Sequence, residues 1–293
     1  MCETETVSPS LVFSLLKKRA PDSHKGCYGT LTVLAGSSLY RGAAALCVKG
    51  ALRCGTGIVR LASVEPVVTA VASKVDACIF RPLPMGEDGS VDRDALPLIL
   101  SDAKKSTAFL AGCGLTQSDS VRYLIPALIE SVSCPLLLDA DALNVLSSSP
   151  SLLQKAQKTP VITPHVGEMS RLCGLPIDEI LRDPDRICLR FAEDCGCVTV
   201  LKGAVTRIAS PDGRLSLHDR PNSGLAKGGS GDCLAGILAG LLAQGLGPFD
   251  AARCAVWLHG EAAARCAAVW SQTAMLPDDL PSFLGEIFRE RQL

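Results

Sequence analysis

Residues 222–245, NSGLAKGGSGDCLAGILAGLLAQG, join a glycine-rich turn directly to an apolar segment. A turn that leads into a helix in this way gathers unpaired backbone N–H groups at the positive end of the helix dipole. Such a point favours an anion, typically a phosphate. Asp232 lies just after the turn, and a carboxylate beside a phosphate site suits a base that activates a hydroxyl group for phosphoryl transfer.

Asp232 also has a simpler interpretation, because aspartate often caps a helix N-terminus and glycines are common in loops before helices. The segment behind it, residues 233–243, is apolar all round and carries Gly236 and Gly240. It is too short to span a bilayer, which takes about 20 apolar residues, so we expect a buried helix packed closely through its glycines. The turn is not a Walker A motif, because no Gly-Lys-Ser/Thr follows the glycines.

The composition indicates a large core and little net charge. Of the 293 residues, 47% are hydrophobic and 20% are charged, and the net charge is −1. The absence of a basic block argues against a nucleic-acid or anionic-membrane partner. The N-terminus places acidic residues before a short apolar patch and basic residues after it, which is the wrong order for a secretory signal. We therefore expect a cytoplasmic protein with no nucleic-acid or membrane partner.

The fourteen cysteines are scattered through the chain, and many lie inside apolar runs. No pair of Cys-x-x-Cys motifs with zinc spacing is present, and the nearest cluster is Cys195-Gly196-Cys197. In a chain of this size without an export signal, they are interpreted as reduced, small core residues.

Short apolar or β-branched runs alternate with helical stretches over nearly the whole chain. The expected strands are residues 30–35, 58–62, 77–80, 107–111, 136–139, 161–163, 198–201, 205–209 and 214–218. The expected helices are residues 42–54, 66–73, 118–132, 184–195, 232–244 and 249–270. Pro211-Asp212-Gly213 predicts a hairpin turn between the last two strands. Unalternated apolar strands separated by helices predict a mostly parallel sheet with helices on both faces, in one α/β domain over residues 1–293.

Loops rich in glycine and polar residues follow five of the expected strands. They are residues 36–43, 112–116, 139–144, 163–168 and 202–206. In open parallel sheets, ligands bind beyond the carboxyl ends of the strands. These loops are therefore expected to share one cleft with the glycine-rich turn.

Several residues in these loops have both a structural and a functional interpretation. Asp139 and Asp141 are either turn formers and caps or carboxylates that hold Mg²⁺ through water. His165 either packs at the surface of a rigid turn or contacts a ligand. Lys202 either enters a hairpin or contacts phosphate. The remaining histidines are interpreted as structural: His24, His218 and His259.

Taken together and in order, these motifs resemble those of the ADP/ATP-dependent NAD(P)H-hydrate dehydratase family, whose fold is ribokinase-like. The similarity extends over most of the chain. The segments that carry it are HKGCYGTLTVLAGS (24–37), YRGAAALCVKGALRCGTGIVRLAS (40–63), AGCGL (111–115), LLLDADALNVL (136–146), TPHVGEMSRL (163–172), VTVLKGAVTRI (198–208) and AKGGSGDCLAGILAGLL (226–242).

The resemblance implies a repair reaction. NADH and NADPH become useless when their nicotinamide ring is hydrated at the C5–C6 double bond, and family members restore the S epimers of these hydrates, NADHX and NADPHX. They phosphorylate the 6-hydroxyl group with ADP or ATP and Mg²⁺, and phosphate is then eliminated. Phosphorylation helps because hydroxide is a poor leaving group, and the lone pair of the ring nitrogen can assist the expulsion of phosphate.

The resemblance also implies a role for each matching residue. Asp232 would remove the proton of the 6-hydroxyl group. The N–H groups of Gly229, Ser230 and Gly231 would stabilise charge on the transferring phosphoryl group. The implied substrate-binding residues are Ala43, Gly114, His165 and Asp232. The implied nucleotide-binding residues are Lys202, Gly203, Ala204, Val205, Thr206 and Gly231. The metal ligands stay open.

The chain departs from the family pattern at a few points. Residues 112–116 read Gly-Cys-Gly-Leu-Thr where the family often has Gly-Pro-Gly-Leu-Gly, so the helix start there is expected to differ. Ser230 stands where threonine is common. Only about 25 residues precede the first motif, so we expect no fused epimerase domain and a separate NAD(P)H-hydrate epimerase in the same pathway. The resemblance favours ADP as the donor and suggests a homotetramer.

Two other functions share parts of this pattern. A kinase for a small alcohol, such as a thiazole or pyrimidine vitamin precursor, would have the same glycine-rich turn and nucleotide site. The order of TPHVGE, DADALNVL and AGCGL argues against it. A nucleotide-binding regulatory module without turnover agrees less well with the sequence, because Asp232 is present.

Overall fold

The computed structural model describes residues 4–292 and is built around one ten-stranded sheet. The strands are β1 (Thr4–Thr6), β2 (Thr30–Leu34), β3 (Ile58–Val64), β4 (Ile79–Leu83), β5 (Ala108–Ala111), β6 (Leu136–Leu138), β7 (Val161–Ile162), β8 (Val198–Leu201), β9 (Thr206–Ala209) and β10 (Leu215–His218). The α-helices are α1 (Pro9–Leu15), α2 (Arg41–Arg53), α3 (Glu65–Ala72), α4 (Leu96–Ala103), α5 (Asp119–Ser131), α6 (Asp141–Leu146), α7 (Val166–Cys173), α8 (Ile177–Arg182), α9 (Pro184–Cys195), α10 (Ser230–Ala243), α11 (Pro248–Ala274) and α12 (Leu280–Glu290).

The strands follow the order β1-β10-β9-β8-β7-β6-β5-β2-β3-β4. Among the described strands, only β9 runs antiparallel to its neighbours, β8 and β10. The predicted hairpin toward the C-terminal side of the sheet is therefore confirmed. So is the predicted α/β fold with a mostly parallel sheet.

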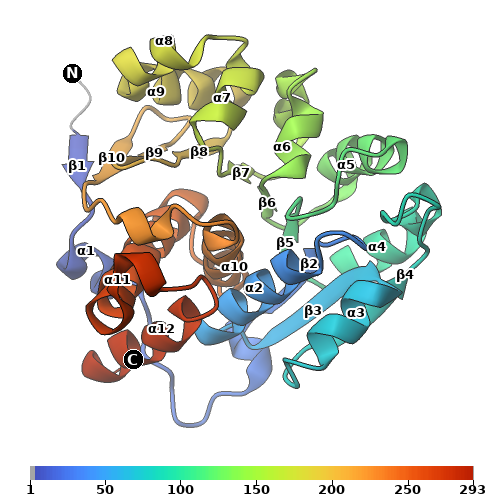
Figure 1. The fold of residues 1–293 in the computed structure, drawn as a ribbon, viewed down its shortest axis with the longest axis horizontal. Coiled ribbons are helices and arrows are strands. Elements are labelled where there is room, and N and C mark those ends of the chain that lie inside the picture. Colours follow the sequence, from blue (N-terminus) through green and yellow to red (C-terminus); the bar gives the residue numbers. More distant parts are fainter. Residues whose placement is uncertain (1–3, 293) are drawn as a thin grey trace.

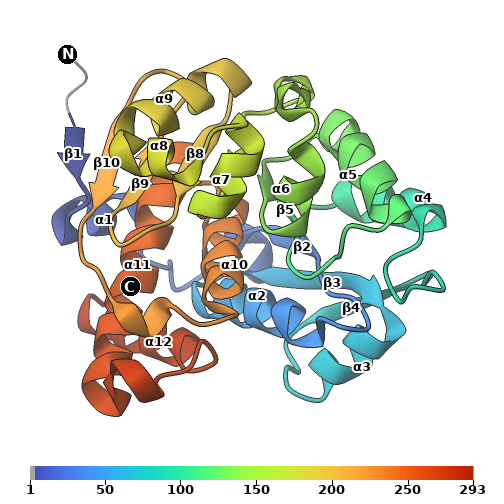
Figure 2. The same cartoon turned by 45° about the horizontal axis from the view of Figure 1, so that its top comes forward.

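Helices cover both faces of the sheet (Figure 1). On one face, α10 contacts β2, β5 and β6, and α11 contacts β8, β9 and β10. The same layer contains α2 and α3, whereas α4 to α9 lie on the opposite side, with α9 against β8 and β9 (Figure 2). Because both faces are covered, β5 and β6 are buried along their whole length, and this explains their unbroken apolar sequences.

Six of the twelve described α-helices were not predicted, namely α1, α4, α6, α7, α8 and α12. The sheet differs from the prediction mainly at its edges. β1 was not predicted, because three residues give no periodicity, yet it pairs in parallel with β10. β4 occupies residues 79–83 where 77–80 was expected. It contains Pro82, which is tolerated because β4 is an edge strand. Within the described part of the chain, no helix has both the length and the apolar character that crossing a bilayer requires.

Successive strands are added to opposite sides of β2, so the strand order of the sheet reverses between β2 and β5. The chain leaves β2 through α2 and enters β3 on one side, whereas β5 lies on the other side of β2. In open α/β sheets, ligands bind in the crevice at such a point. Gly36, after β2, donates its N–H to the carbonyl of Cys113, after β5, at 2.8 Å. This bond fixes the two strand ends beside each other.

Helix α10 packs closely against α2 through glycines. A Cβ added to Gly236 would lie 2.1 Å from the carbonyl oxygen of Cys47, and one added to Gly50 would lie 2.7 Å from the carbonyl oxygen of Cys233. No side chain fits at either position without moving a backbone. The predicted buried helix with glycine-mediated packing is confirmed, and α2 is its partner.

Candidate functional site

Asp232 lies in the first turn of α10 and does not cap the helix. The N-cap residue is Gly229, whose φ of 101° is in the left-handed region that favours glycine, and no side chain caps the helix. The helix begins at Ser230, two residues before the predicted start. The interpretation of Asp232 as a helix cap is therefore wrong.

The turn before α10 provides two backbone N–H groups suited to an anion. Within residues 4–292, neither Gly229 nor Gly231 donates a backbone hydrogen bond. The N–H of Ser230 donates to the carbonyl of Lys227 at 3.3 Å, which is long for such a bond. Two of the three N–H groups proposed for phosphoryl stabilisation are thus available, at the positive end of the helix dipole.

The carboxyl group of Asp232 is partly buried. Burial, followed by the nearby carboxylate of Asp139, raises the pKa of Asp232 to about 6. A base whose pKa lies near the working pH is partly ionised and can accept a proton. It is also basic enough to take that proton from a hydroxyl group. The environment of Asp232 therefore suits general base catalysis.

A group of buried charges lies next to the turn. The Nζ atom of Lys202 is 3.0 Å from Oδ1 of Asp139 and 3.9 Å from Oε2 of Glu168. Burial opposes the charge on Lys202, but the two carboxylates outweigh it and raise the pKa of Lys202. Burial also raises the pKa of Glu168 to about 7. A Cβ added to Gly231 would lie 3.3 Å from Nζ of Lys202, so the amine and the turn are adjacent.

A cavity of about 620 Å³ opens beside Lys202 and Gly231. It lies between the end of β10, the start of α10 and the middle of α11. Five of the six residues predicted to bind the nucleotide line it: Lys202, Gly203, Ala204, Thr206 and Gly231. Val205 is not part of the lining, and its carbonyl accepts a hydrogen bond from Arg207. The predicted nucleotide set is thus largely gathered around one cavity.

Several buried polar atoms in the cavity wall have no hydrogen-bond partner in the described part of the chain. They are Oγ of Ser230, both ring nitrogens of His218 and Nε2 of His259. Buried polar groups normally have partners, so these atoms are unsatisfied groups in the wall of the cavity. Burial lowers the pKa of His259 to about 4 and also lowers that of His218, which keeps both rings neutral near pH 7.

His218 and His259 were interpreted as structural. Both line the cavity. His218 is the last residue of β10, and a strand-end position was the signal that the sequence offered. His259 lies inside α11 among small and apolar residues, where nothing local marks a ligand contact.

The predicted substrate residues lie in two places. A Cβ added to Gly114, which has a φ of 66°, would lie 3.1 Å from Cβ of Ala43, so these two residues are adjacent. His165 instead lines the cavity with the nucleotide set. It is also the N-cap of α7, because its Nδ1 accepts hydrogen bonds from the N–H groups of Gly167 and Glu168. His165 therefore has a structural role in addition to its place in the cavity wall.

The loop of residues 112–116 depends on Asp141. Thr116 replaces the family's usual glycine and adopts a φ of 72°, a conformation that is strained for a β-branched residue. Its N–H donates to Oδ2 of Asp141 at 2.8 Å. Asp141 thus anchors this loop, while Asp139 pairs with Lys202.

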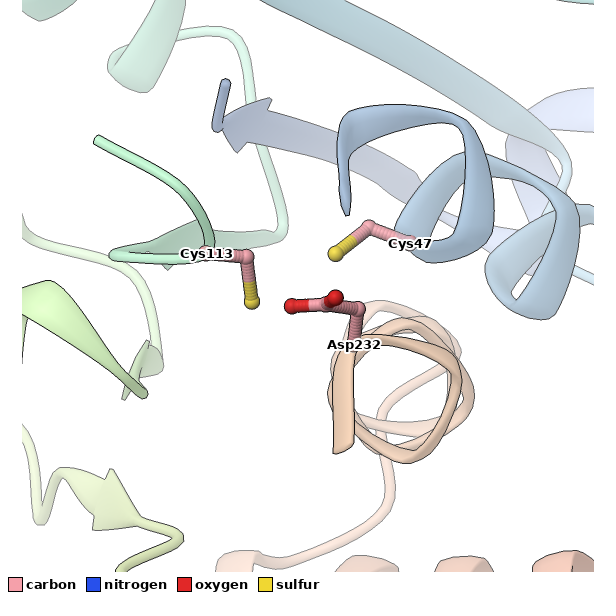
Figure 3. A group of neighbouring side chains, drawn as sticks. All are labelled: Cys47, Cys113 and Asp232. Atoms are coloured by element: carbon pink, nitrogen blue, oxygen red, sulfur yellow. The ribbon is translucent and has the colours of Figure 1, made fainter. Parts of the chain in front are cut away.

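Two cysteines face Asp232 (Figure 3), and none of the three residues lines the cavity. Cys47 comes from α2 and Cys113 from the loop after β5. One ligand atom from each of the three residues lies within 4.8 Å of the other two. Neither cysteine was predicted to belong to the site. Cys47 lies in an apolar run, whereas Cys113 lies in the 112–116 loop that was expected to border the cleft, and nothing in the local sequence indicates that the two meet.

Comparison with protein families and curated proteins gives consistent matches. The model of the NAD(P)H-hydrate dehydratase family matches residues 31–285. A bifunctional NAD(P)H-hydrate repair enzyme from Moorella thermoacetica is 37% identical over 276 residues, which are 94% of this chain and 52% of that protein. This chain spans about half the length of the first curated relatives that it matches. The ADP-dependent (S)-NAD(P)H-hydrate dehydratase of Bacillus subtilis is 33% identical over 283 residues, 95% of both chains.

Solved structures give the same assignment. The ADP/ATP-dependent NAD(P)H-hydrate dehydratase from Bacillus subtilis, co-crystallised with ATP and Mg²⁺, has a TM-score of 0.83 and 30% identity, over 98% of this chain and 99% of that one. A ribokinase-like superfamily protein from Enterococcus faecalis has a TM-score of 0.84 at 22% identity, over 99% of this chain and 97% of that one, which confirms the ribokinase-like fold. By its sequence and its fold, the chain belongs to the NAD(P)H-hydrate dehydratase family.

Proposed function

We propose that this chain is an (S)-NAD(P)H-hydrate dehydratase that restores NADH and NADPH from their hydrates at the expense of ADP or ATP. The observation that carries the proposal is the position of Asp232. Its carboxyl group has a pKa of about 6 and lies in the first turn of α10, beside two available backbone N–H groups. A base beside an anion site, in a chain of the matching family, supports this proposal.

In the proposed reaction, Asp232 accepts the proton of the substrate's 6-hydroxyl group. The oxygen then attacks the terminal phosphorus of the nucleotide, and the nucleotide leaves with one phosphate fewer. The N–H groups of Gly229 and Gly231 stabilise the negative charge on the transferring phosphoryl group. Phosphate then leaves C6 with the electrons of the C6–O bond and C5 gives up a proton, which restores the C5–C6 double bond and yields the reduced cofactor.

The cavity beside the turn is the proposed nucleotide site. Lys202 is suited to contact phosphates because it is adjacent to Gly231 and lines the cavity. The unpartnered nitrogens of His218 and His259 suit the polar groups of a nucleotide. Ala43 and Gly114 are proposed to admit the hydrated dinucleotide on the other side of the turn, since small residues let a bulky substrate approach the backbone.

Mg²⁺ fits the donors that the chain offers next to the proposed phosphate site. Asp139 and Glu168 are buried carboxylates, and Mg²⁺ prefers oxygen ligands. Burial raises the pKa of Glu168 to about 7, and a bound cation would favour its ionised form. These two residues would hold the ion directly or through water. When bound, Mg²⁺ would neutralise charge on the nucleotide phosphates.

The proposal also includes a homotetramer, a separate epimerase that supplies the S epimer, and a cytoplasmic location. Leu39, Tyr40 and Trp270 are exposed apolar side chains that a subunit interface would cover. The name of the Moorella thermoacetica relative describes a bifunctional repair enzyme, which supports a pathway with a second repair activity. Light scattering coupled to gel filtration tests the assembly, and a mass other than that of four chains would contradict the tetramer.

The activity is tested by incubating the protein with hydrated NADH, Mg²⁺ and either ADP or ATP. We expect recovery of the reduced-nicotinamide absorbance, with one phosphate released per NADH formed and with a higher rate for ADP. A small-alcohol kinase would leave the absorbance unchanged and would phosphorylate a vitamin precursor instead. Failure to recover NADH with either donor, in protein shown to be folded, would overturn the proposal.

A further inference from the structure

Cys47, Cys113 and Asp232 form the only group of metal-binding side chains of this kind within residues 4–292. The two thiols have no exposed surface, and neither is used in the proposed reaction. Most of the other described cysteines are also buried, but none of them meets a second thiol and a carboxylate in such a group. Burial alone therefore does not account for this arrangement.

The three ligand atoms nearly match a zinc-type geometry. A tetrahedral Zn²⁺ has Zn–S distances of about 2.3 Å and Zn–O distances of about 2.0–2.2 Å, so its ligand atoms lie about 3.5–3.8 Å apart. The atoms here lie within 4.8 Å of one another, so closing around an ion requires shifts of about 1 Å or less. Figure 3 shows the three side chains pointing toward a common centre from three different segments.

The surroundings also suit a cation. Oδ2 of Asp139 lies 3.8 Å from Sγ of Cys113, and Asp139 in turn pairs with Lys202. Two thiolates and one carboxylate around a divalent ion carry a net charge of −1, which Lys202 partly offsets. Three protein ligands leave a fourth position for water, as in open rather than structural zinc sites. Asp232 is the partly exposed member of the group, so an ion would enter from its side.

The site lies directly behind the residues proposed to bind the substrate. Ala43 is one helical turn before Cys47 on α2, and Gly114 follows Cys113 in the chain. An ion held by the three side chains would therefore link α2, which carries Ala43, to the loop that carries Gly114. It would also coordinate the carboxylate of the proposed base, Asp232.

We propose that Cys47, Cys113 and Asp232 form a binding site for one thiophilic divalent cation, such as Zn²⁺, and that its occupation inhibits the enzyme reversibly. Binding converts both thiols to thiolates, and their two protons pass to solvent. A carboxylate coordinated to the ion cannot accept the proton of the substrate. Binding itself is independent of the proposed function, whereas the inhibition rests on it.

Binding is tested without turnover, with Cd²⁺ as a spectroscopic probe. Protein stripped with a chelator and reduced with a phosphine is titrated with Cd²⁺, and the ultraviolet absorption of cadmium–thiolate bonds is recorded. We expect saturation at one ion per chain. The absorption should disappear in Cys47→Ala and in Cys113→Ala, and should persist in Cys188→Ala, a matched control in which an equally buried cysteine of α9 is removed. Cys47→Ser, which is nearly isosteric, replaces Cys47→Ala if that variant does not fold.

Inhibition is then measured with Zn²⁺ in the presence of Mg²⁺, ADP and hydrated NADH. The wild-type protein should lose activity and regain it on addition of a chelator. Cys47→Ala should turn over normally in the absence of zinc. Its inhibition should require at least about 100-fold more Zn²⁺ than inhibition of the wild type, because loss of a direct ligand should cost more metal affinity than the 10–100-fold that loss of an outer partner costs.

A missing cadmium signal, or a signal that survives in Cys47→Ala, overturns the site. Equal zinc sensitivity of Cys47→Ala and wild type overturns the inhibition, and absence of any turnover without zinc points instead to failure of the proposed function.

Discussion

The two sides of the α10 N-terminus are built differently. On one side lies a cavity of about 620 Å³ whose wall includes Lys202 and unpartnered nitrogens of two histidines. On the other side, Asp232 faces two thiols that have no exposed surface, and Gly114 lies against Ala43. The first side has room for a ligand before it arrives, whereas the second is closely packed around the proposed base.

This difference predicts that the two sides contribute differently to ligand binding. A nucleotide bound as proposed would enter a cavity that is already formed, at little cost in rearrangement. The proposed substrate surface consists instead of small residues, Ala43 and Gly114, that lie against each other. We expect changes on the cavity side to alter nucleotide binding, and a change of Asp232 on the packed side to alter turnover.

Asp232→Asn is the strongest test of this division. Asparagine keeps the shape of the side chain but cannot accept the hydroxyl proton, so turnover should fall by a factor of about 10²–10⁴. Binding of ADP, measured by calorimetry, should change little because Asp232 does not line the cavity. Near-wild-type turnover in this variant would show that Asp232 is not the base.

Lys202→Met probes the cavity side. Loss of the amine leaves the carboxylate of Asp139, which is 1% exposed, without its partner at 3.0 Å. Breaking such a pair typically costs about 3–5 kcal/mol of stability, and ADP binding should weaken as well. Denaturant unfolding and calorimetry measure the two effects. As a control, the double variant Asp139→Asn with Lys202→Met should recover most of the stability but not the affinity, and a double variant as unstable as the single one would contradict the pairing.

The raised pKa of Asp232 predicts that the proposed base destabilises the folded protein. Its folded pKa is about 6 and its ordinary value is 3.8, so the folded state holds the proton to higher pH than the unfolded state does. Stability is therefore lost as the pH rises from about 4 to about 6, by an amount on the order of 2–3 kcal/mol. Asp232→Asn should raise the free energy of unfolding by that amount at about pH 8 and should have no such effect below about pH 4. An effect of equal size at both pH values would assign it to packing instead.

Thr116→Gly should give the smallest change. A left-handed conformation costs a residue other than glycine about 1–2 kcal/mol, and glycine gives back about 0.4–1 kcal/mol through the entropy of the unfolded chain. The net gain in stability should be about 1 kcal/mol or less, measured as a rise in melting temperature, with turnover unchanged. A destabilised variant would show that contacts of the Thr116 side chain outweigh its backbone strain.

The parts of the site that could be predicted from sequence are those in which one short segment carries the signal. The 228–232 turn and the 202–206 loop are contiguous, and most of their residues do lie around the cavity. His259 and Cys47 were missed because each lies inside an apolar helix, and only the packing of distant segments gives it polar neighbours. The start of α10 was predicted two residues too late, because Ser230 and Gly231 are poor helix formers. In the folded protein they form the first turn of the helix, where tertiary packing holds them. Nothing in the local sequence reports that context.

The contact between Gly236 and the Cys47 carbonyl has a consequence for how substrate range can evolve in this protein. Because two backbones meet there, the separation of α2 from α10 is set by main-chain atoms, and side-chain substitutions elsewhere leave it unchanged. Residues of α2 that are proposed to face the substrate can therefore be exchanged, one at a time, while the carboxylate of Asp232 stays at a constant distance from the helix that carries them. New specificity can be acquired without rebuilding the acid–base step.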